Sequence, residues 1–121
     1  MAYAGICAAD NLQSNSDPYF SFNSHQEIIT FVGAGGNCSV STSTGNAAPT
    51  VSATGGFTIP GRSPFLLTAT GSDSNGDPLT YCWEERDTGA ILNLGDADNG
   101  ASPLFRSFNA STNPTRYFPQ M

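Results

Sequence analysis

The stretch SDSNGDPLTYCWE, residues 72–84, joins a strong turn signal to an alternating segment. Its first half, 73–78, contains Asp, Asn, Gly and Pro, the residues that favour tight turns. In the second half, Leu79, Tyr81 and Trp83 share one face of an extended chain, because successive strand side chains point to opposite sides. The stretch therefore predicts a turn followed by a β-strand, with Trp83 in the core.

Shorter stretches before it follow the same pattern. Residues 50–53 and 57–59 alternate, and Gly-Gly and Pro-Gly pairs punctuate the chain after each of them. Phe65, Leu67 and Ala69 share one face of a further predicted strand. Short strands joined by Gly, Pro and Asn turns predict a mainly β fold, namely an Ig-like β-sandwich.

The pattern weakens after Trp83. Residues 87–103 are rich in Gly, Asp and Asn and predict an irregular loop. The aromatic residues within 105–118 lack clean alternation, so no convincing pair of closing strands is visible. We expect the sandwich to be incomplete, and the aromatic residues either to pack onto further strands or to bind carbohydrate.

One helix is predicted upstream, from Ser24 to Val32. Ser24 is the expected N-cap, Glu27 completes a capping box, and Gly33 ends the helix. Two helical turns are not stable alone, so this helix needs a packing partner. The Gly-rich and Ser/Thr-rich residues that follow are typical of a linker. The predicted organisation is therefore a helical segment 1–35, a linker 36–49 and a β-module 50–121.

Composition excludes several classes of partner. The 121 residues have a formal net charge of −6, with four cationic side chains, all arginine. Nucleic-acid binding and polybasic membrane binding both need a cationic face, so neither is expected. No apolar run is long enough to insert into a membrane, and no signal peptide is visible. We expect a secreted protein whose export signal lies on sequence outside this stretch.

The three cysteines cannot all pair with one another. Cys7 and Cys38 flank the predicted helix, and a disulfide between them would tie the helix to the preceding loop. Cys82 is interpreted as a small strand residue. No two cysteines have the close spacing of a zinc site.

The stretch MAYAGIC, residues 1–7, continues through Asp-Asn-Leu-Gln at 10–13 and Asp-Pro-Tyr-Phe at 17–20 into the predicted helix. This order resembles the Met-turn and final helix of bacterial secreted, reprolysin-like metzincins, which are zinc metalloproteases. In that family a methionine forms an apolar floor beneath the zinc-binding histidines, and this role carries over onto Met1. The alternative is that Met1 is an ordinary initiator and the stretch is simply apolar.

A second resemblance follows the linker. Asn46-Ala47-Ala48-Pro49-Thr50-Val51, the segment 57–60 and the stretch 72–84 together resemble the first half of a PKD or cadherin-like module. Finding both resemblances in this order implies a protease whose substrate is protein or peptide, followed by an Ig-like module.

This chain departs from the metzincin pattern at the metal site. The family needs HExxHxxGxxH, in which histidines bind zinc and the glutamate activates water. The sequence holds one histidine, His25, so zinc belongs to a parent enzyme whose ligands are absent here. We therefore expect this chain alone to be inactive.

Asp73 and Asp77 are candidate calcium ligands, because carboxylates around an Asn-Gly turn offer the oxygen atoms that calcium prefers. The alternative is that Asp73 and Asn75 cap a hairpin turn and stay solvated. Glu84 and Glu85 could add ligands, but alternation sends them to opposite faces.

The leading hypothesis is a partial chain of a secreted zinc metalloendopeptidase. The alternative from another class is a non-catalytic extracellular β-sandwich that serves adhesion or binding. A self-sufficient intracellular protein is a third possibility, which the unpaired helix and the incomplete sandwich argue against.

Overall fold

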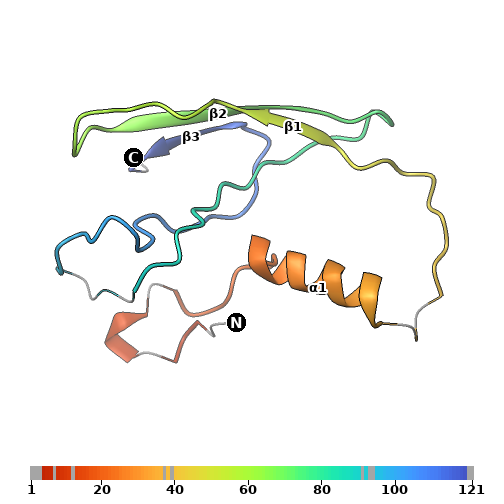
Figure 1. Cartoon of the computed structure of the whole chain (residues 1–121), viewed down its shortest axis with the longest axis horizontal. Coiled ribbons are helices and arrows are strands. Elements are labelled where there is room, and N and C mark those ends of the chain that lie inside the picture. The colour runs from red at the N-terminus through yellow and green to blue at the C-terminus, as the bar shows by residue number, and fades with distance from the viewer. Residues whose placement is uncertain are drawn as a thin grey trace. The chain divides into compact units, whose positions relative to one another are not determined.

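The chain forms two compact units, Met1–Thr42 and Ser43–Met121, here called the helical unit and the β-unit (Figure 1). The boundary between them falls inside the predicted linker 36–49. The structure is a computed structural model that describes residues 4–6, 8–11, 13–36, 38, 40–90, 92 and 95–119.

The helical unit contains a short 3-10 helix, η1 (Ala8–Asp10), and the α-helix α1 (Phe22–Ala34). Ser21 is the N-cap of α1, because its Oγ accepts a hydrogen bond from the Ser24 backbone N–H at 3.5 Å. The prediction of Ser24 as the N-cap was wrong. Ser24 instead supplies the third N–H group of the helix, which needs a cap from outside.

α1 also continues past its predicted end. Gly33 is helical, and the backbone N–H groups of Gly35 and Gly36 both donate to the Phe31 carbonyl at 2.9 Å. A glycine inside a helix costs about 1 kcal/mol relative to alanine. This cost is small enough for the helix to continue through Gly33 to Ala34. The stop therefore lies at Gly35.

The apolar side chains of α1 are uncovered. Ile28, Ile29, Phe31 and Val32 are 44–68% exposed, and α1 has no buried residue. Among the described residues no helix is both long and apolar enough to cross a membrane. The helical unit therefore presents an apolar surface on a short helix.

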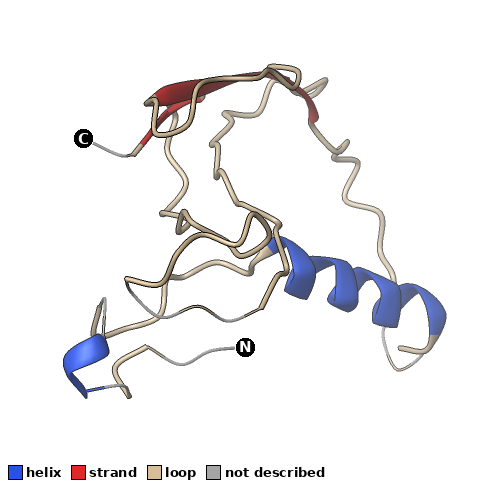
Figure 2. Cartoon of the chain, turned by 60° about the vertical axis from the view of Figure 1, so that its left-hand side comes forward, coloured by secondary structure: helices blue, strands red, loops and turns tan. Residues whose placement is uncertain are grey.

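The β-unit is built on an antiparallel three-stranded sheet with the order β1-β2-β3. Its strands are β1 (Thr50–Ala53), β2 (Phe65–Ser72) and β3 (Thr115–Phe118). β1 pairs with the second half of β2 and β3 with the first half, on opposite edges. Figure 2 shows the strands in red, with long loops joining them. The predicted strands at 50–53 and 65–69 are confirmed, as is a small mainly β fold.

Two predicted strands are not formed. Residues 57–59 belong to the loop between β1 and β2, and Phe57 packs its ring edge-on to Phe65 at 6.3 Å. The segment 79–84 makes a single bridge, Tyr81 to Ser111, in place of a ladder. Its side chains still alternate, because Leu79 and Tyr81 are partly buried while Thr80 is exposed.

One strand was missed by the sequence pattern. The sequence shows no convincing pair of closing strands after Trp83, and the structure forms one such strand, β3, which pairs with β2. β3 has only four residues between Pro114 and Pro119, which is too short to show a period by itself. The described residues of the β-unit form no second sheet.

The core of the β-unit is a small aromatic cluster on β2 and β3. The rings of Phe65 and Phe118, paired in register, stack at 4.7 Å, and Phe105 meets both rings edge-on. Glu85 holds Phe105 in place, because its carboxylate accepts the backbone N–H groups of Leu104 and Phe105 at 2.8 and 2.7 Å. Phe105 and Phe118 thus find their packing partner within this chain.

Candidate functional site

Two sequence-predicted site residues lie outside the described residues. They are Met1, the proposed Met-turn residue, and Cys7, the proposed disulfide partner of Cys38. The Cys38 side chain is exposed. The Met-turn role and the disulfide both stay predictions.

The Asp73 carboxylate organises the turn that follows β2. Its Oδ1 accepts backbone N–H groups from Asn75 at 2.8 Å and from Asp77 at 3.2 Å. Asn75 in turn accepts the Ala47 N–H at 2.8 Å, which fastens the segment before β1 to this turn. Gly76 has a φ of 81°, a conformation that glycine adopts without strain. These bonds match the capping alternative for Asp73.

The described residues do not assemble a metal centre from charged or thiol ligands. No group of three or more His, Cys, Asp and Glu side chains comes together among them. Asp73 and Asp77 would need several further oxygen ligands for calcium, which takes six to eight. His25 is an exposed residue of α1, so it does not fit a zinc site built on converging histidines. The calcium assignment stays a prediction.

Asp73→Ala should lower the melting temperature of the β-unit. The substitution removes an acceptor shared by two backbone N–H groups, at a cost of about 1 kcal/mol in the free energy of unfolding. Asp73→Asn is the matched control, because its side-chain oxygen can accept the same bonds. Thermal unfolding in EDTA checks the expectation that only the alanine variant is destabilised. A calcium-dependent rise in the melting temperature of the wild type, absent in Asp73→Asn, would assign calcium to this turn.

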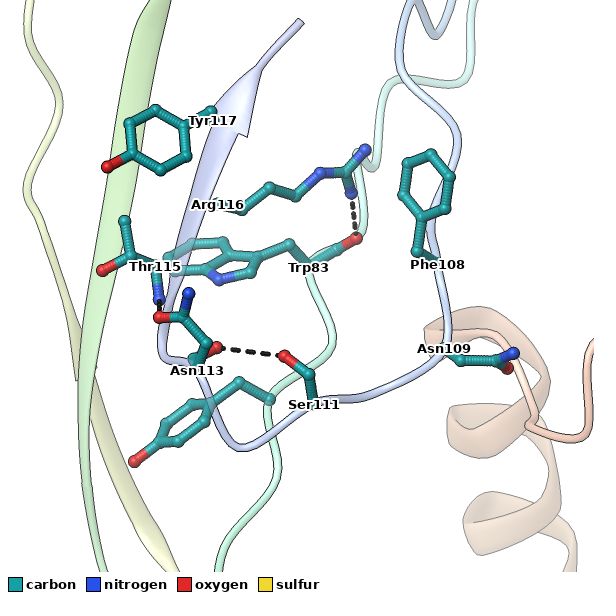
Figure 3. A pocket seen from close by; sticks show the side chains of 9 residues that line it. Trp83, Phe108, Asn109, Ser111, Asn113, Thr115, Arg116 and Tyr117 are labelled. Carbon is teal, nitrogen blue, oxygen red and sulfur yellow. Dashed lines mark hydrogen bonds between the residues drawn. The ribbon is translucent and has the colours of Figure 1, made fainter. Parts of the chain in front are cut away.

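A cavity of about 450 Å³ lies beside β3 (Figure 3). Three parts of the β-unit form its wall: the segment 79–84, the loop before β3, and β3 itself. Its lining residues are Tyr81, Trp83, Phe108, Asn109, Ser111, Asn113, Thr115, Arg116 and Tyr117. Tyr81 and Ser111 hold two of these parts together through backbone N–H···O bonds of 2.7 and 3.1 Å. The cavity is therefore bounded by segments that hydrogen bonds tie to one another.

Trp83 is fixed in the wall by its indole. Nε1 donates to the Pro114 carbonyl at 3.2 Å, and the same carbonyl accepts the Ala69 N–H of β2 at 3.1 Å. A buried or half-buried indole usually finds such a partner for its N–H. The sequence analysis identified Trp83 as a core residue, and the structure makes it a half-buried wall of the cavity.

Arg116 connects three segments of the β-unit, namely β3, the segment 79–84 and the loop before β3. Its Nη1 donates to the Trp83 carbonyl at 2.9 Å, and its Nη2 donates to the Arg106 carbonyl. The guanidinium carbon lies 4.9 Å from the centre of the Phe108 ring and 4.5 Å from that of Phe118. Its hydrogen bonds and ring contacts make this guanidinium a structural part of the wall.

Hydroxyl and amide groups complete the lining. Asn113 Oδ1 accepts the Thr115 N–H at 3.0 Å, and Ser111 Oγ donates to the Asn113 carbonyl at 3.4 Å. No His, Cys, Asp or Glu is among the residues that line this cavity. Among the lining residues, the hydroxyl groups of Ser111 and Thr115 therefore have no imidazole or carboxylate neighbour, and the wall offers hydroxyl, amide and aromatic groups to a ligand.

Gly71 of β2 lets Tyr81 approach the sheet. A Cβ atom at this position would stand 2.7 Å from Tyr81 Oη and 2.9 Å from Leu79 Cδ1. Both distances are below normal contact, so only glycine leaves room for these side chains as they stand. The sequence marked Tyr81 and Trp83 by their alternation, but the polar residues from 109 to 115 had no periodic signal to reveal them.

Comparison of the chain with protein-family models, curated proteins and solved structures finds no match. Its function must therefore be argued from its own residues.

Proposed function

We propose that this chain is a non-catalytic part of a secreted zinc metalloendopeptidase of the metzincin class. Residues 1–35 would belong to the catalytic domain, and residues 50–121 would form a PKD-like, Ig-like module that spaces the enzyme or holds its protein substrate. The observation that carries the proposal is the order of the segments. The Met-turn-like stretch 1–7 precedes the helix α1, and the β-unit follows.

The exposed side of α1 supports this role for the helical unit. Ile29, Phe31 and Val32 are each more than half exposed, although a helix of this length gains most of its stability from packing an apolar face. The final helix of a larger catalytic domain would bury such a face against that domain.

Catalysis would reside in the parent enzyme. Zinc there would polarise the substrate carbonyl and activate water, and its ligands would come from HExxHxxGxxH. His25 is the single histidine of this chain and is exposed on α1. The residues present do not fit the zinc ion, so we assign no step of hydrolysis to them.

A non-catalytic extracellular binding module is the second candidate function. The cavity at Trp83 favours it, because that cavity is formed by residues of the β-unit alone and has a lining suited to ligand binding. This function would hold with or without a protease attached.

Peptide hydrolysis separates the two candidates. We expect the purified chain to cleave no fluorogenic peptide with or without added zinc. We expect the longer polypeptide encoded by the same reading frame to show zinc-dependent cleavage that chelation abolishes. An in-frame stop codon shortly before Met1, or an upstream frame without HExxHxxGxxH, would contradict the protease proposal and leave the binding module.

A further inference from the structure

We propose that the cavity at Trp83 binds a neutral carbohydrate. The proposal concerns the β-unit and does not depend on whether a protease precedes it. The cavity volume, about 450 Å³, lies within the range of small-molecule sites, about 300–1,000 Å³. Such sites combine apolar and aromatic walls with a few polar groups that set orientation.

Aromatic rings supply the apolar part of the site. Figure 3 shows the Trp83 indole and the Phe108 ring on two different chain segments that border the cavity. The face of an aromatic ring is electron-rich, and the C–H groups on one side of a sugar ring are apolar and slightly positive. The guanidinium carbons of Arg106 and Arg116 lie 4.8 and 4.9 Å from the centre of the Phe108 ring, which holds this ring in the wall. A sugar ring therefore fits against the Trp83 indole, which the bond from Nε1 to Pro114 holds in place beside Phe108.

Amide groups supply the polar part. No described residue hydrogen-bonds to the side chain of Asn109, which lines the cavity and is exposed. Asn113 uses Oδ1 for the Thr115 N–H, which leaves the two donors of its Nδ2 without a partner among the described residues. A carboxamide offers both donors and an acceptor, and each sugar hydroxyl can donate one bond and accept others. The two asparagines are therefore suited to binding the hydroxyl groups of a sugar through hydrogen bonds.

An added peptide strand fits this place poorly. Strand addition needs free backbone N–H and C=O groups along an edge. At the start of β3 the Thr115 N–H is bonded to Asn113 Oδ1, and the Pro114 carbonyl accepts both Trp83 Nε1 and the Ala69 N–H. These backbone groups at the start of β3 are thus already bonded within the chain, so recognition of a ligand by side chains is favoured.

The charges favour a neutral ligand over an acidic one. Arg116 is the one charged residue in the lining, and its Nη1 and Nη2 already donate to the carbonyls of Trp83 and Arg106. The whole chain carries −6 and has no lysine, so its field repels polyanions. The negative charge of the chain repels a polysaccharide rich in carboxylates. One guanidinium that is already hydrogen-bonded would offset little of that repulsion.

Intrinsic fluorescence tests the proposal directly, because Trp83 is the only tryptophan of the chain. We would titrate the purified chain with neutral cello-, xylo-, manno- and N-acetylchito-oligosaccharides. Alginate and polygalacturonate oligosaccharides form the acidic arm, and a casein digest forms the peptide arm. We expect a saturable change of Trp83 emission with at least one neutral series. Emission that no neutral series changes, or that only the acidic or peptide arm changes, would overturn the proposal.

Two variants tie the signal to the cavity. Asn109→Ala removes an amide that bonds to no described residue, so it should fold as the wild type does and raise the Kd about tenfold, the equivalent of one lost hydrogen bond. Phe108→Leu keeps an apolar side chain but removes the ring, and should also weaken binding. Asn23→Ala, an exposed asparagine on α1, is the matched control and should leave the Kd unchanged. Equal Kd values for wild type, Asn109→Ala and Phe108→Leu would place the ligand elsewhere and refute the assignment.

Discussion

Phe118→Ala should lower the free energy of unfolding of the β-unit by about 3–5 kcal/mol, the usual cost of removing a buried phenylalanine side chain. Phe118 is only 6% exposed and is one of two buried apolar residues among those described, together with Ala69. Its ring stacks on Phe65 at 4.7 Å and meets Phe105 edge-on at 5.1 Å. A core of this size cannot redistribute the lost contacts over many other side chains. The substitution should therefore remove most of the stability of the β-unit.

Urea denaturation would measure this effect as a shift of the midpoint at unchanged slope. Leu66→Ala is the matched control, because Leu66 lies on the same strand pair but is 47% exposed and should cost under about 1 kcal/mol. If Phe118→Ala does not fold, Phe118→Leu keeps part of the buried volume and should give a smaller loss than a full truncation. Equal losses for Phe118→Leu and Leu66→Ala would show that the aromatic cluster is not the core.

Arg116→Met should destabilise the β-unit by about 2–4 kcal/mol, since hydrogen bonds from a charged group contribute about 1.5–3 kcal/mol each and not all of this adds. The carbonyls of Trp83 and Arg106 would lose their donors, and the rings of Phe108 and Phe118 would lose the guanidinium. Methionine keeps the apolar stem but has no donor. The contacts of β3 with the segment 79–84 and with the loop before β3 should therefore weaken together.

Arg116→Lys separates the role of geometry from that of charge. A lysine ammonium is a compact charge and lacks the planar fork that reaches two carbonyls while stacking on rings, so the variant should stay clearly less stable than wild type. Arg62→Met is the control, because Arg62 is exposed in the loop between β1 and β2 and should change stability by less than about 0.5 kcal/mol. Thermal unfolding followed through Trp83 emission measures both effects. A lysine variant as stable as wild type would refute the bridging role of Arg116.

Sequence patterns over a few neighbouring residues predicted part of the fold correctly. The alternation in 50–53 and 65–69 predicted strands that the structure contains, and the Asp-Asn-Gly turn after β2 follows from side chains that bond to their own backbone. The helix was predicted for the right region, but its cap was misplaced by three residues. Ser21 and Ser24 are equally good capping residues, and only the backbone conformation at Ser21 decides between them.

The two predicted strands of the β-unit that are not formed share one cause, which lies outside the segments themselves. Residues 57–59 alternate, yet Phe57 turns its ring to Phe65 and the segment finds no strand to pair with. The segment 79–84 alternates as well, but it gains only the bridge from Tyr81 to Ser111. A strand exists only when a second segment supplies the opposite hydrogen-bonding groups, and no local pattern reports on that segment.

The candidate site likewise combines features that the local sequence predicts with features that only the tertiary structure shows. The amino-acid sequence by itself determined the turn at 73–77, the burial face of β2 and the importance of Trp83, because each depends on residues close together along the chain. Only the tertiary structure brought Asn109, Asn113 and Arg116 to Trp83, and only it produced β3, because the contacts at Trp83 join segments about thirty residues apart and the pairing of β3 with β2 joins residues about fifty apart. Alternation depends on near neighbours in the chain, whereas a cavity wall depends on which distant segments meet.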